Sequence, residues 1–427
     1  MDRFINDDIK IENKYFSIYS DDNELEVYPV ILNELTNKRK EILEFLNIED
    51  FPKTRVNFYR NKDNIINFRT QLGEVPYQIN SKAGYFHDNE IYAYVDKEKV
   101  HNGNIPILFA HEFTHLVYQN LIQQNNRITW IDEGLAQYIS GERGMQEKYP
   151  YFFKYWYYDS IIRRDKELPK IEYLYKHGSK YGSFVDNETN KYNGYSISYL
   201  IVKYLVEKYK DKFSELIKNE EKIYNIEPNI INETIEYYNN LFRPDLVPDF
   251  NELSTPEELM DYMNLNILYG WVDNENKEHL NDLKGFKPIY HTMSIEEILS
   301  YKVGTCIDQV QLEKYFFDKY NIENKIYCHR LYREEIQEGD NPNMHCFLIF
   351  HMNDNWYFFE HSNCPKRGIH KFDSLEDALN WRISNEFNDR VLTEIPEIPV
   401  GLTINEFNKY VNSFDSINIE NIRNKER

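Results

Sequence analysis

The chain has 427 residues, which is longer than a typical single domain and predicts two or three domains. Its formal charge of −21, from 71 acidic against 50 basic residues, argues against nucleic acid or an anionic membrane as a general partner, because both attract basic surfaces. No stretch approaches eighteen uninterrupted apolar residues, and the first residues lack the basic and apolar parts of a signal peptide. We therefore expect a soluble, cytoplasmic protein; its oligomeric state stays open.

The first third of the chain predicts a helix, two strands and a second helix, in that order. Apolar residues follow helical spacing from Asp22 to about Leu46, with Pro29 as a kink or a restart of the helix. Residues 54–59 and 90–95 alternate in the manner of strands. These segments lead into a second stretch with helical spacing, residues 105–120, which predicts a helix with Pro106 in its first turn.

That helix carries the sequence His111-Glu112-Phe113-Thr114-His115. Histidines four residues apart lie one turn above each other on one helix face, so both rings can bind one metal ion at about 2.0–2.1 Å. Glu112 lies one step round the helix, where it can deprotonate water without being a ligand. The alternative is a pair of helix histidines packed in a core beside a surface glutamate.

A second motif follows at residues 130–138, Trp-Ile-Asp-Glu-Gly-Leu-Ala-Gln-Tyr, in which Glu133 can supply a third ligand. With this motif the chain resembles the gluzincin metallopeptidases of the peptidase MA-like group. The resemblance implies that His111, His115 and Glu133 bind zinc (Zn2+) and that Glu112 is the general base. It also implies an edge strand before the metal helix that binds extended peptide by strand addition, for which residues 89–95 are the candidate. An ordinary sheet edge is the alternative.

Further along, residues 195–205 resemble the gluzincin segment in which a tyrosine precedes a helix that ends in an aromatic-leucine pair. The resemblance implies that the hydroxyl of Tyr195 hydrogen-bonds the oxyanion of the tetrahedral intermediate. Tyr192 and Tyr199 are neighbours that could fill this role, and simple helix packing is the alternative.

Composition changes after Asn240. Residues 243–249 contain two prolines and read as a linker. Thr255-Pro256-Glu257-Glu258 then has the pattern of a helix start, with Thr as the N-cap and Glu three residues later. We therefore predict two domains, residues 1–250 and residues 251–427.

All four cysteines, Cys306, Cys328, Cys346 and Cys364, lie in the second domain at spacings unlike those of disulfide scaffolds or zinc sites. We interpret them as reduced thiols. Cys306 follows a glycine-ended loop and opens an apolar-periodic helix, where unpaired N–H groups and the helix dipole favour the thiolate.

Residues 344–350 and 356–361 read as the two strands of a hairpin whose turn lies at 353–355. This pairing brings Glu360 to Asn363 roughly opposite His345, where an acid could orient a histidine base. Cys346 follows His345 along the strand, so its side chain should point to the opposite face and be buried.

A cysteine at a helix start, a histidine on one strand and an acid on the next is similar to the transglutaminase-like, papain-related fold. The resemblance implies that Cys306 is the nucleophile, His345 the base and Glu360 the orienting acid. Because Asp is usual at the third position, His361 and Asn363 stay open as substitutes. A buried structural cysteine beside a strand histidine is the alternative.

The whole sequence thus predicts an α+β protein, a gluzincin-like zinc peptidase domain followed by a transglutaminase-like domain. The first would hydrolyse a peptide or protein substrate, and the second would act on an amide through a thioester. Two other readings remain: the second domain is a non-catalytic binding module that presents protein substrates, or it is the only active enzyme and the zinc domain is a scaffold.

Overall fold

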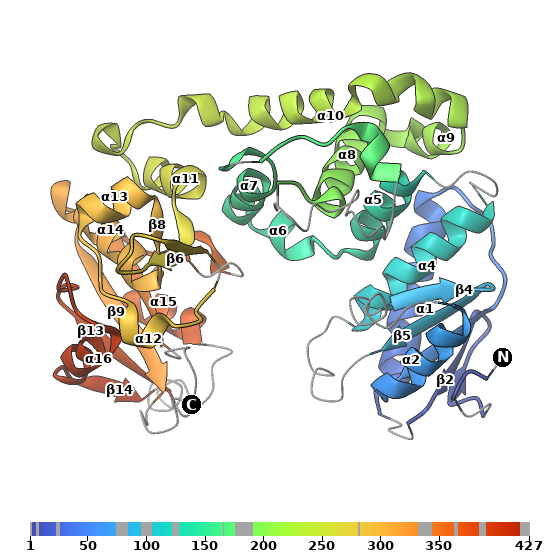
Figure 1. Ribbon diagram of the computed structural model, residues 1–427, viewed down its shortest axis with the longest axis horizontal. Helices are drawn as coiled ribbons and strands as arrows, with labels where there is room; N and C mark the ends of the chain where they lie inside the picture. Colours follow the sequence, from blue (N-terminus) through green and yellow to red (C-terminus); the bar gives the residue numbers. More distant parts are fainter. Residues whose placement is uncertain are drawn as a thin grey trace. The chain divides into compact units, whose positions relative to one another are not determined.

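The chain is mixed α+β in the computed structural model and divides into two compact units (Figure 1). One unit comprises Met1–Gly144 and Ser160–Phe242, and the other comprises Met145–Asp159 and Arg243–Arg427. Residues 145–159 thus belong with the C-terminal part of the chain, which no feature of the sequence had indicated. The structure describes residues 2–5, 8–22, 26–73, 84–94, 105–121, 128–164, 166–175, 191–280, 282–331, 344–362, 366–383 and 390–418.

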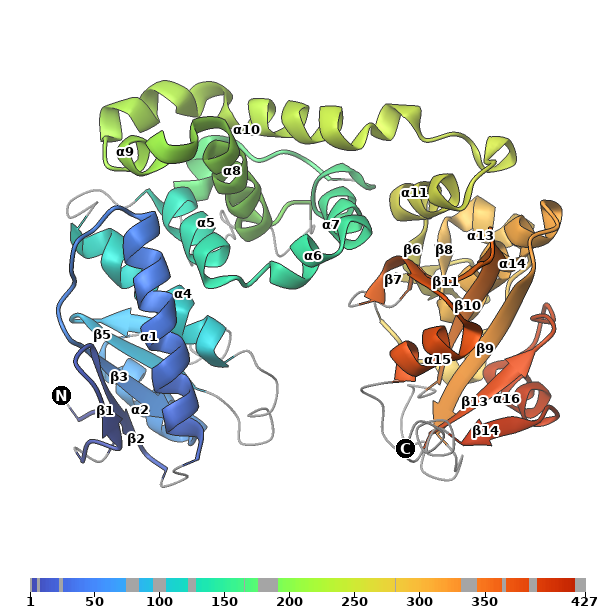
Figure 2. The same cartoon turned by 180° about the vertical axis from the view of Figure 1, so that it is seen from behind.

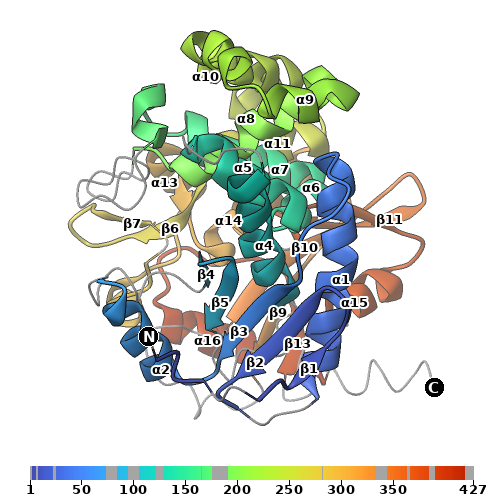
Figure 3. The same cartoon turned by 90° about the vertical axis from the view of Figure 1, so that its right-hand side faces the viewer.

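The first unit is built on a five-stranded sheet of order β1-β2-β3-β5-β4 (Figure 3). The strands β2, β3 and β5 run parallel, and β1 and β4 are antiparallel to their neighbours. The strands are β1 (Ile11–Glu12), β2 (Phe16–Ser20), β3 (Thr54–Tyr59), β4 (Gly84–His87) and β5 (Glu90–Tyr94). The helices are α1 (Val27–Phe45), α2 (Lys62–Gln71), α4 (Ile105–Leu121), α5 (Thr129–Ser140), α8 (Gly194–Tyr209), α9 (Phe213–Ile217) and α10 (Glu220–Phe242).

Helices cover both faces of this sheet, as the opposite views of Figures 1 and 2 show. On one face Phe58 of β3 contacts Tyr28 of α1 and Phe109 of α4, with ring centroids 6.1 and 5.7 Å apart. On the other face Phe68 of α2 stacks on Tyr92 of β5 at 4.5 Å. Helix α4, which carries the His-Glu-x-x-His sequence, therefore packs on the same face of the sheet as α1.

The strand order corrects one expectation. The candidate peptide-binding edge at residues 89–95 was wrong, because its described part, β5, lies between β3 and β4 and is hydrogen-bonded on both sides. The edge on this side of the sheet is β4, and nothing in the sequence indicated it. Pro29 falls in the first turn of α1, so it starts the helix instead of kinking it.

The second unit contains a six-stranded antiparallel sheet of order β12-β11-β10-β9-β13-β14 and a small sheet of order β7-β6-β8. The strands are β6 (Leu268–Val272), β7 (Glu278–Leu280), β8 (Val303–Gly304), β9 (Asn324–Leu331), β10 (Met344–Met352), β11 (Asn355–Glu360), β12 (Gly368–Phe372), β13 (Arg390–Ile395) and β14 (Ser416–Asn418). The helices are α6 (Gly144–Lys148), α7 (Pro150–Tyr157), α11 (Pro256–Asn266), α12 (Phe286–Ile289), α13 (Ile295–Tyr301), α14 (Cys306–Lys319), α15 (Leu375–Ile383) and α16 (Ile404–Asn412).

The six-stranded sheet lies between α14 and α15. Phe317 of α14 stacks on Phe350 of β10 at 4.4 Å, while Trp381 of α15 packs against Phe358 of β11 at 5.3 Å on the opposite face. The predicted hairpin is confirmed: β10 and β11 pair from Leu348 opposite Phe359 to Met352 opposite Asn355. Its two turn residues have φ of 51° and 60°, as a type I′ turn requires.

Helix starts in this unit follow local chemistry. The predicted capping box is present, with the Thr255 hydroxyl accepting from the N–H of Glu258 and Pro256 at the first helical position. Within the part of the chain that the structure describes, no helix combines the length and the hydropathy of a membrane span.

Candidate active sites

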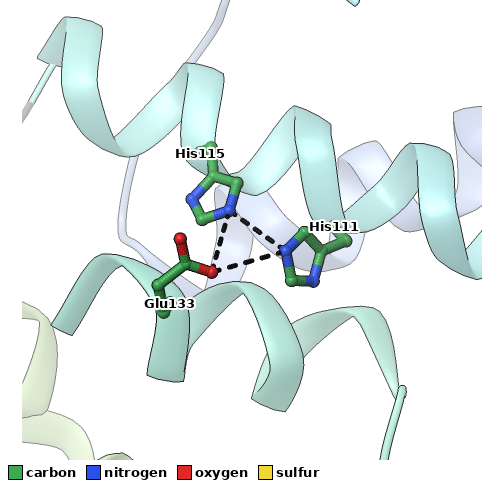
Figure 4. Close-up of side chains that lie close together, drawn as sticks. All are labelled: His111, His115 and Glu133. Atoms are coloured by element: carbon green, nitrogen blue, oxygen red, sulfur yellow. Dashed lines mark hydrogen bonds and ion pairs between the residues drawn. The ribbon is translucent and has the colours of Figure 1, made fainter. Parts of the chain in front are cut away.

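Side chains from two helices converge in the first unit (Figure 4). His111 and His115 extend from α4, and Glu133 extends toward them from α5. The Nε2 atoms of the two histidines lie 3.0 Å apart, and Oε2 of Glu133 lies 3.4 Å from Nε2 of His115 and 3.7 Å from Nε2 of His111. Among the described residues no other group of three histidine, cysteine or acidic side chains comes together so closely.

These separations suit a zinc ion. Four ligands at about 2.0–2.1 Å in tetrahedral arrangement lie roughly 3.3–3.4 Å from one another. The three observed separations of 3.0, 3.4 and 3.7 Å bracket that value. Two imidazole nitrogens and one carboxylate oxygen also form a donor set typical of catalytic zinc, which leaves a fourth position open.

The outer nitrogens of both histidines meet carboxylates. Nδ1 of His115 lies 2.6 Å from Oδ1 of Asp132, whose other oxygen accepts from Gln119 at 2.7 Å. Nδ1 of His111 lies 3.1 Å from Oε2 of Glu142. A carboxylate at Nδ1 keeps the proton there and turns the lone pair of Nε2 inward, which is how proteins orient metal-binding histidines.

The electrostatics of the cluster favour a cation. Burial opposes the charged form of His111, but hydrogen bonds to Glu133 and Glu142 raise its pKa to about 9. Burial acts against His115 in the same way, and the charges of Asp132 and Glu133 raise its pKa well above the ordinary value. Three carboxylates around two imidazoles thus create a negative potential where a cation would sit.

Glu112 is buried beside the ligands and lies against the edge strand β4. A Cβ atom on Gly84, the first residue of β4, would lie 2.3 Å from Oε1 of Glu112. Only glycine therefore allows the strand to pass this close to the carboxylate in its present position. The carboxylate of Glu112, which the sequence suggested as the general base, thus lies directly against the backbone of the edge strand.

Helix α8 approaches α5 closely at Gly134, the residue after Glu133. A Cβ atom there would lie 2.4 Å from the backbone oxygen of Ser198, so a larger residue would separate the two helices. The glycine of the second motif is thus explained by packing. The close approach places Tyr195, in the first turn of α8, beside α5, where its carbonyl accepts from Nε2 of Gln137 at 2.9 Å.

Gln137 connects this tyrosine to the ligand helix, because the same amide nitrogen also lies 3.3 Å from the carbonyl oxygen of Glu133. Of the other tyrosines considered for the oxyanion role, Tyr199 is buried and packs against Tyr138 with ring centroids 6.3 Å apart. Tyr192 is half-buried and precedes α8. Tyr195 and Tyr199 thus both contact α5, Tyr195 through its carbonyl and Tyr199 through its ring.

The second unit holds the other candidate site at the start of α14. Thr305 caps the helix and its hydroxyl donates to Asp308 at 2.8 Å, while Asp308 also accepts from the N–H of Met293 and the hydroxyl of Tyr290. This buried network fixes the first turn, so Cys306 is held at the positive end of the helix dipole, as the sequence predicted.

His345 and Glu360 meet across the hairpin, with Nε2 of the histidine 2.6 Å from Oε2 of the carboxylate. His361 was one of two alternatives to Glu360 as the partner of His345. Its Nδ1 instead lies 2.6 Å from Oε1 of Gln309. Asn363 and Cys364 lie outside the described residues. The imidazole of His345 also hydrogen-bonds the sulfur of Cys306, so the three side chains form a continuous chain.

The ionisation of this chain suits a thiolate and an imidazolium. A hydrogen bond from Cys346 lowers the pKa of Cys306 well below its ordinary value against the effect of burial, and His345 lowers it further. Burial disfavours charge on His345, yet the Glu360 carboxylate and the hydrogen bond to Cys306 raise its pKa to about 9. These contacts favour the thiolate form of Cys306 over the neutral thiol.

Cys346 is buried, as expected, and it also lies beside Cys306, which the sequence did not indicate. Its side chain points to the face that α14 covers, and its thiol reaches the sulfur of Cys306. Burial, followed by the hydrogen bond to Cys306, raises the pKa of Cys346 well above its ordinary value. The opposite shifts of the two thiols make Cys346 the donor in its hydrogen bond with Cys306.

For four residues that contact these sites the sequence predicted no role there: Gly84, Asp132, Glu142 and Cys346. Asp132 could have been identified from the sequence, because it directly precedes Glu133 in the first turn of the same predicted helix. The other three contact the sites through the tertiary structure, and nothing near them in the sequence points to that role. A comparison with known proteins adds no further signal, since neither a family model nor a curated protein matches the chain.

Proposed function

We propose that the first unit is a zinc-dependent peptidase of the gluzincin type that hydrolyses peptide bonds. The observation that carries the proposal is the convergence of His111, His115 and Glu133 at tetrahedral spacing, with Glu112 beside them and the edge strand β4 against Glu112. Three side chains that would hold a metal, together with a buried carboxylate beside them, suit activation of water for attack on a carbonyl.

The residues divide the work as follows. Zinc, when bound, polarises the scissile carbonyl and makes the attacking water more acidic. Glu112 accepts the proton of that water and hands it to the leaving amine. Asp132 and Glu142 keep the histidine lone pairs directed inward, and the hydroxyl of Tyr195 donates to the oxyanion.

The first test is metal content. Purified protein should hold one zinc per chain, and chelation should abolish hydrolysis of a mixed peptide library until zinc is restored. His115→Ala should empty the site, whereas His351→Ala, which alters a histidine of β10 in the second unit, should leave the zinc content unchanged. Protein that stays free of zinc after refolding with the metal would end the proposal.

Gly84→Ala should lower peptide hydrolysis about tenfold to a hundredfold while zinc content stays at one per chain. The new methyl group must displace the carboxylate of Glu112, and a misplacement of about 1 Å can cost a hundredfold in rate. Gly144→Ala is the matched control, since a Cβ atom there meets nothing within 4 Å. Equal turnover in both variants would show that β4 does not set the position of the base.

A second activity is favoured by the contacts of Cys306. Its hydrogen bond to His345, and the 2.6 Å contact of His345 with Glu360, support a cysteine-dependent amide hydrolase or transferase in the second unit. In this reading Cys306 attacks the amide carbonyl, His345 protonates the leaving amine and Glu360 orients the imidazole. The alternative of a binding module requires Cys306 to react as an ordinary thiol, and the alternative of a scaffold requires the first unit to lack zinc.

A further inference from the structure

Cys346 of the second unit lies in contact with two other cysteines, Cys306 and Cys328. Cys306 opens α14, Cys346 lies on β10 and Cys328 lies on β9. Cys346 and Cys328 face each other directly in the antiparallel register, and their sulfur atoms are 3.0 Å apart. This is only about 1 Å longer than a disulfide bond, so the pair can be joined with a small adjustment of the side chains.

The central member of this set is Cys346, because its thiol also hydrogen-bonds the sulfur of Cys306. Cys346 therefore connects Cys306 at the start of α14 with Cys328 on β9 through two successive sulfur contacts. Access differs among the three cysteines: Cys306 is 7% exposed, whereas Cys346 and Cys328 are both 0% exposed. An oxidant from solvent meets Cys306 first.

We propose that these three cysteines form a thiol relay in which peroxide oxidises Cys306 and the oxidation passes to a Cys328–Cys346 disulfide. The inference goes beyond the proposed activities, since it needs only the sulfur contacts. Its product would be a nucleophile returned to the thiolate form, with a cross-strand disulfide buried behind it.

The chemistry balances in three steps. The Cys306 thiolate attacks peroxide, so that an S–O bond forms, the O–O bond breaks and hydroxide leaves. The Cys346 thiol then attacks the sulfenic sulfur, an S–S bond forms, and the hydroxyl group leaves with the thiol proton as water. Finally Cys328 attacks the sulfur of Cys346 and releases Cys306 as thiolate, while the proton of Cys328 neutralises the first hydroxide.

Two protein thiols are oxidised by two electrons in total, and one peroxide is reduced to two waters. The relay has a consequence for the nucleophile. Once Cys346 is in a disulfide it has no proton to donate, so Cys306 loses a hydrogen bond that stabilises its thiolate. Oxidation should therefore weaken the nucleophile without blocking it, and a thiol reductant should restore it.

The test is disulfide mapping of the full-length protein. After one equivalent of hydrogen peroxide, free thiols are alkylated in acid-quenched samples, and peptides are mapped without reduction. We expect a Cys328–Cys346 disulfide, a Cys306 that is still alkylated, and labelling of Cys306 by iodoacetamide that is several-fold slower until a reductant is added. Detection of Cys306 as sulfinic acid with no disulfide would overturn the relay.

Variants separate the steps. Cys328→Ser should stop the relay at a Cys306–Cys346 disulfide, and Cys346→Ser should leave Cys306 to proceed to sulfinic acid. In Cys306→Ser the two buried thiols should stay reduced; if they oxidise at the normal rate, Cys306 is not the entry point. Cys364→Ser is the control and should behave as the unaltered protein. Because the readout is chemical and needs no substrate, failure here leaves the proposed activities untouched.

Discussion

Replacement of Glu112 by glutamine is expected to reduce peptide hydrolysis by at least several hundredfold while one zinc per chain is retained. Glutamine has the size of glutamate and keeps its hydrogen-bonding atoms, so the buried position beside β4 is preserved. What disappears is the basicity that takes the proton from the attacking water, and general-base catalysis contributes about a hundredfold to ten-thousandfold.

The measurement pairs turnover of a peptide library with zinc content of the same preparation. Glu44→Gln is the control, because Glu44 is an exposed residue of α1 whose nearest partner is Lys40 at 3.7 Å. If Glu112→Gln turned over peptides at the normal rate, the peptidase proposal would fail whatever the metal content. If it lost zinc, the effect on rate would say nothing about the base, and hydrolysis would be compared after zinc is restored.

The second large effect is expected at Cys306, which should react with iodoacetamide at pH 7 faster than any other thiol of the chain. An ordinary thiol is only about 3% ionised at this pH, whereas the pKa of Cys306 lies well below its ordinary value. His345→Ala should slow the labelling of Cys306 about tenfold, because one of the two groups that stabilise the thiolate is removed and Cys346 remains.

His351→Ala is the matched control for this measurement. His351 lies on the same strand, and its Nδ1 is 3.3 Å from Glu323, not near Cys306. Uniform labelling of all cysteines, or no change in His345→Ala, would favour the binding-module reading. Labelling sites are identified by peptide mass, so each cysteine reports separately.

The pH profile of this labelling has a definite direction. As the pH falls from 8 to 6, ordinary thiols lose thiolate about tenfold per unit, but a thiol with a lowered pKa stays ionised. Labelling of Cys306 should therefore decline far less than that of the other cysteines. The plateau should extend upward to about pH 9, where His345, whose pKa is raised to about 9, gives up its proton.

Local sequence was sufficient for much of this protein. Helical spacing places His111 and His115 on one face of α4 because residues four apart share a face in any α-helix. Capping chemistry identified the start of α11, and residues 353–355 located the turn of the hairpin that joins His345 to Glu360. Each of these features depends on residues close together in the chain.

Tertiary structure decided the rest, because the remaining contacts join residues that are distant in sequence. The position of β4 at the sheet edge depends on which strands pair, and pairing is set by burial of whole faces rather than by any single strand. Residues 145–159 have helical and aromatic patterns that suit either unit, so only packing assigns them to the second.

The candidate sites show the same division. The motif at residues 130–138 suggested Glu133 as a ligand, but the packing of α5 against α4 determines the distances among His111, His115 and Glu133. Glu142 and Cys346 reach the sites only through the fold, since a helix end and a strand face bring them there. Spacing along one helix or hairpin is fixed by backbone geometry, whereas contacts between elements depend on the packing of the whole unit.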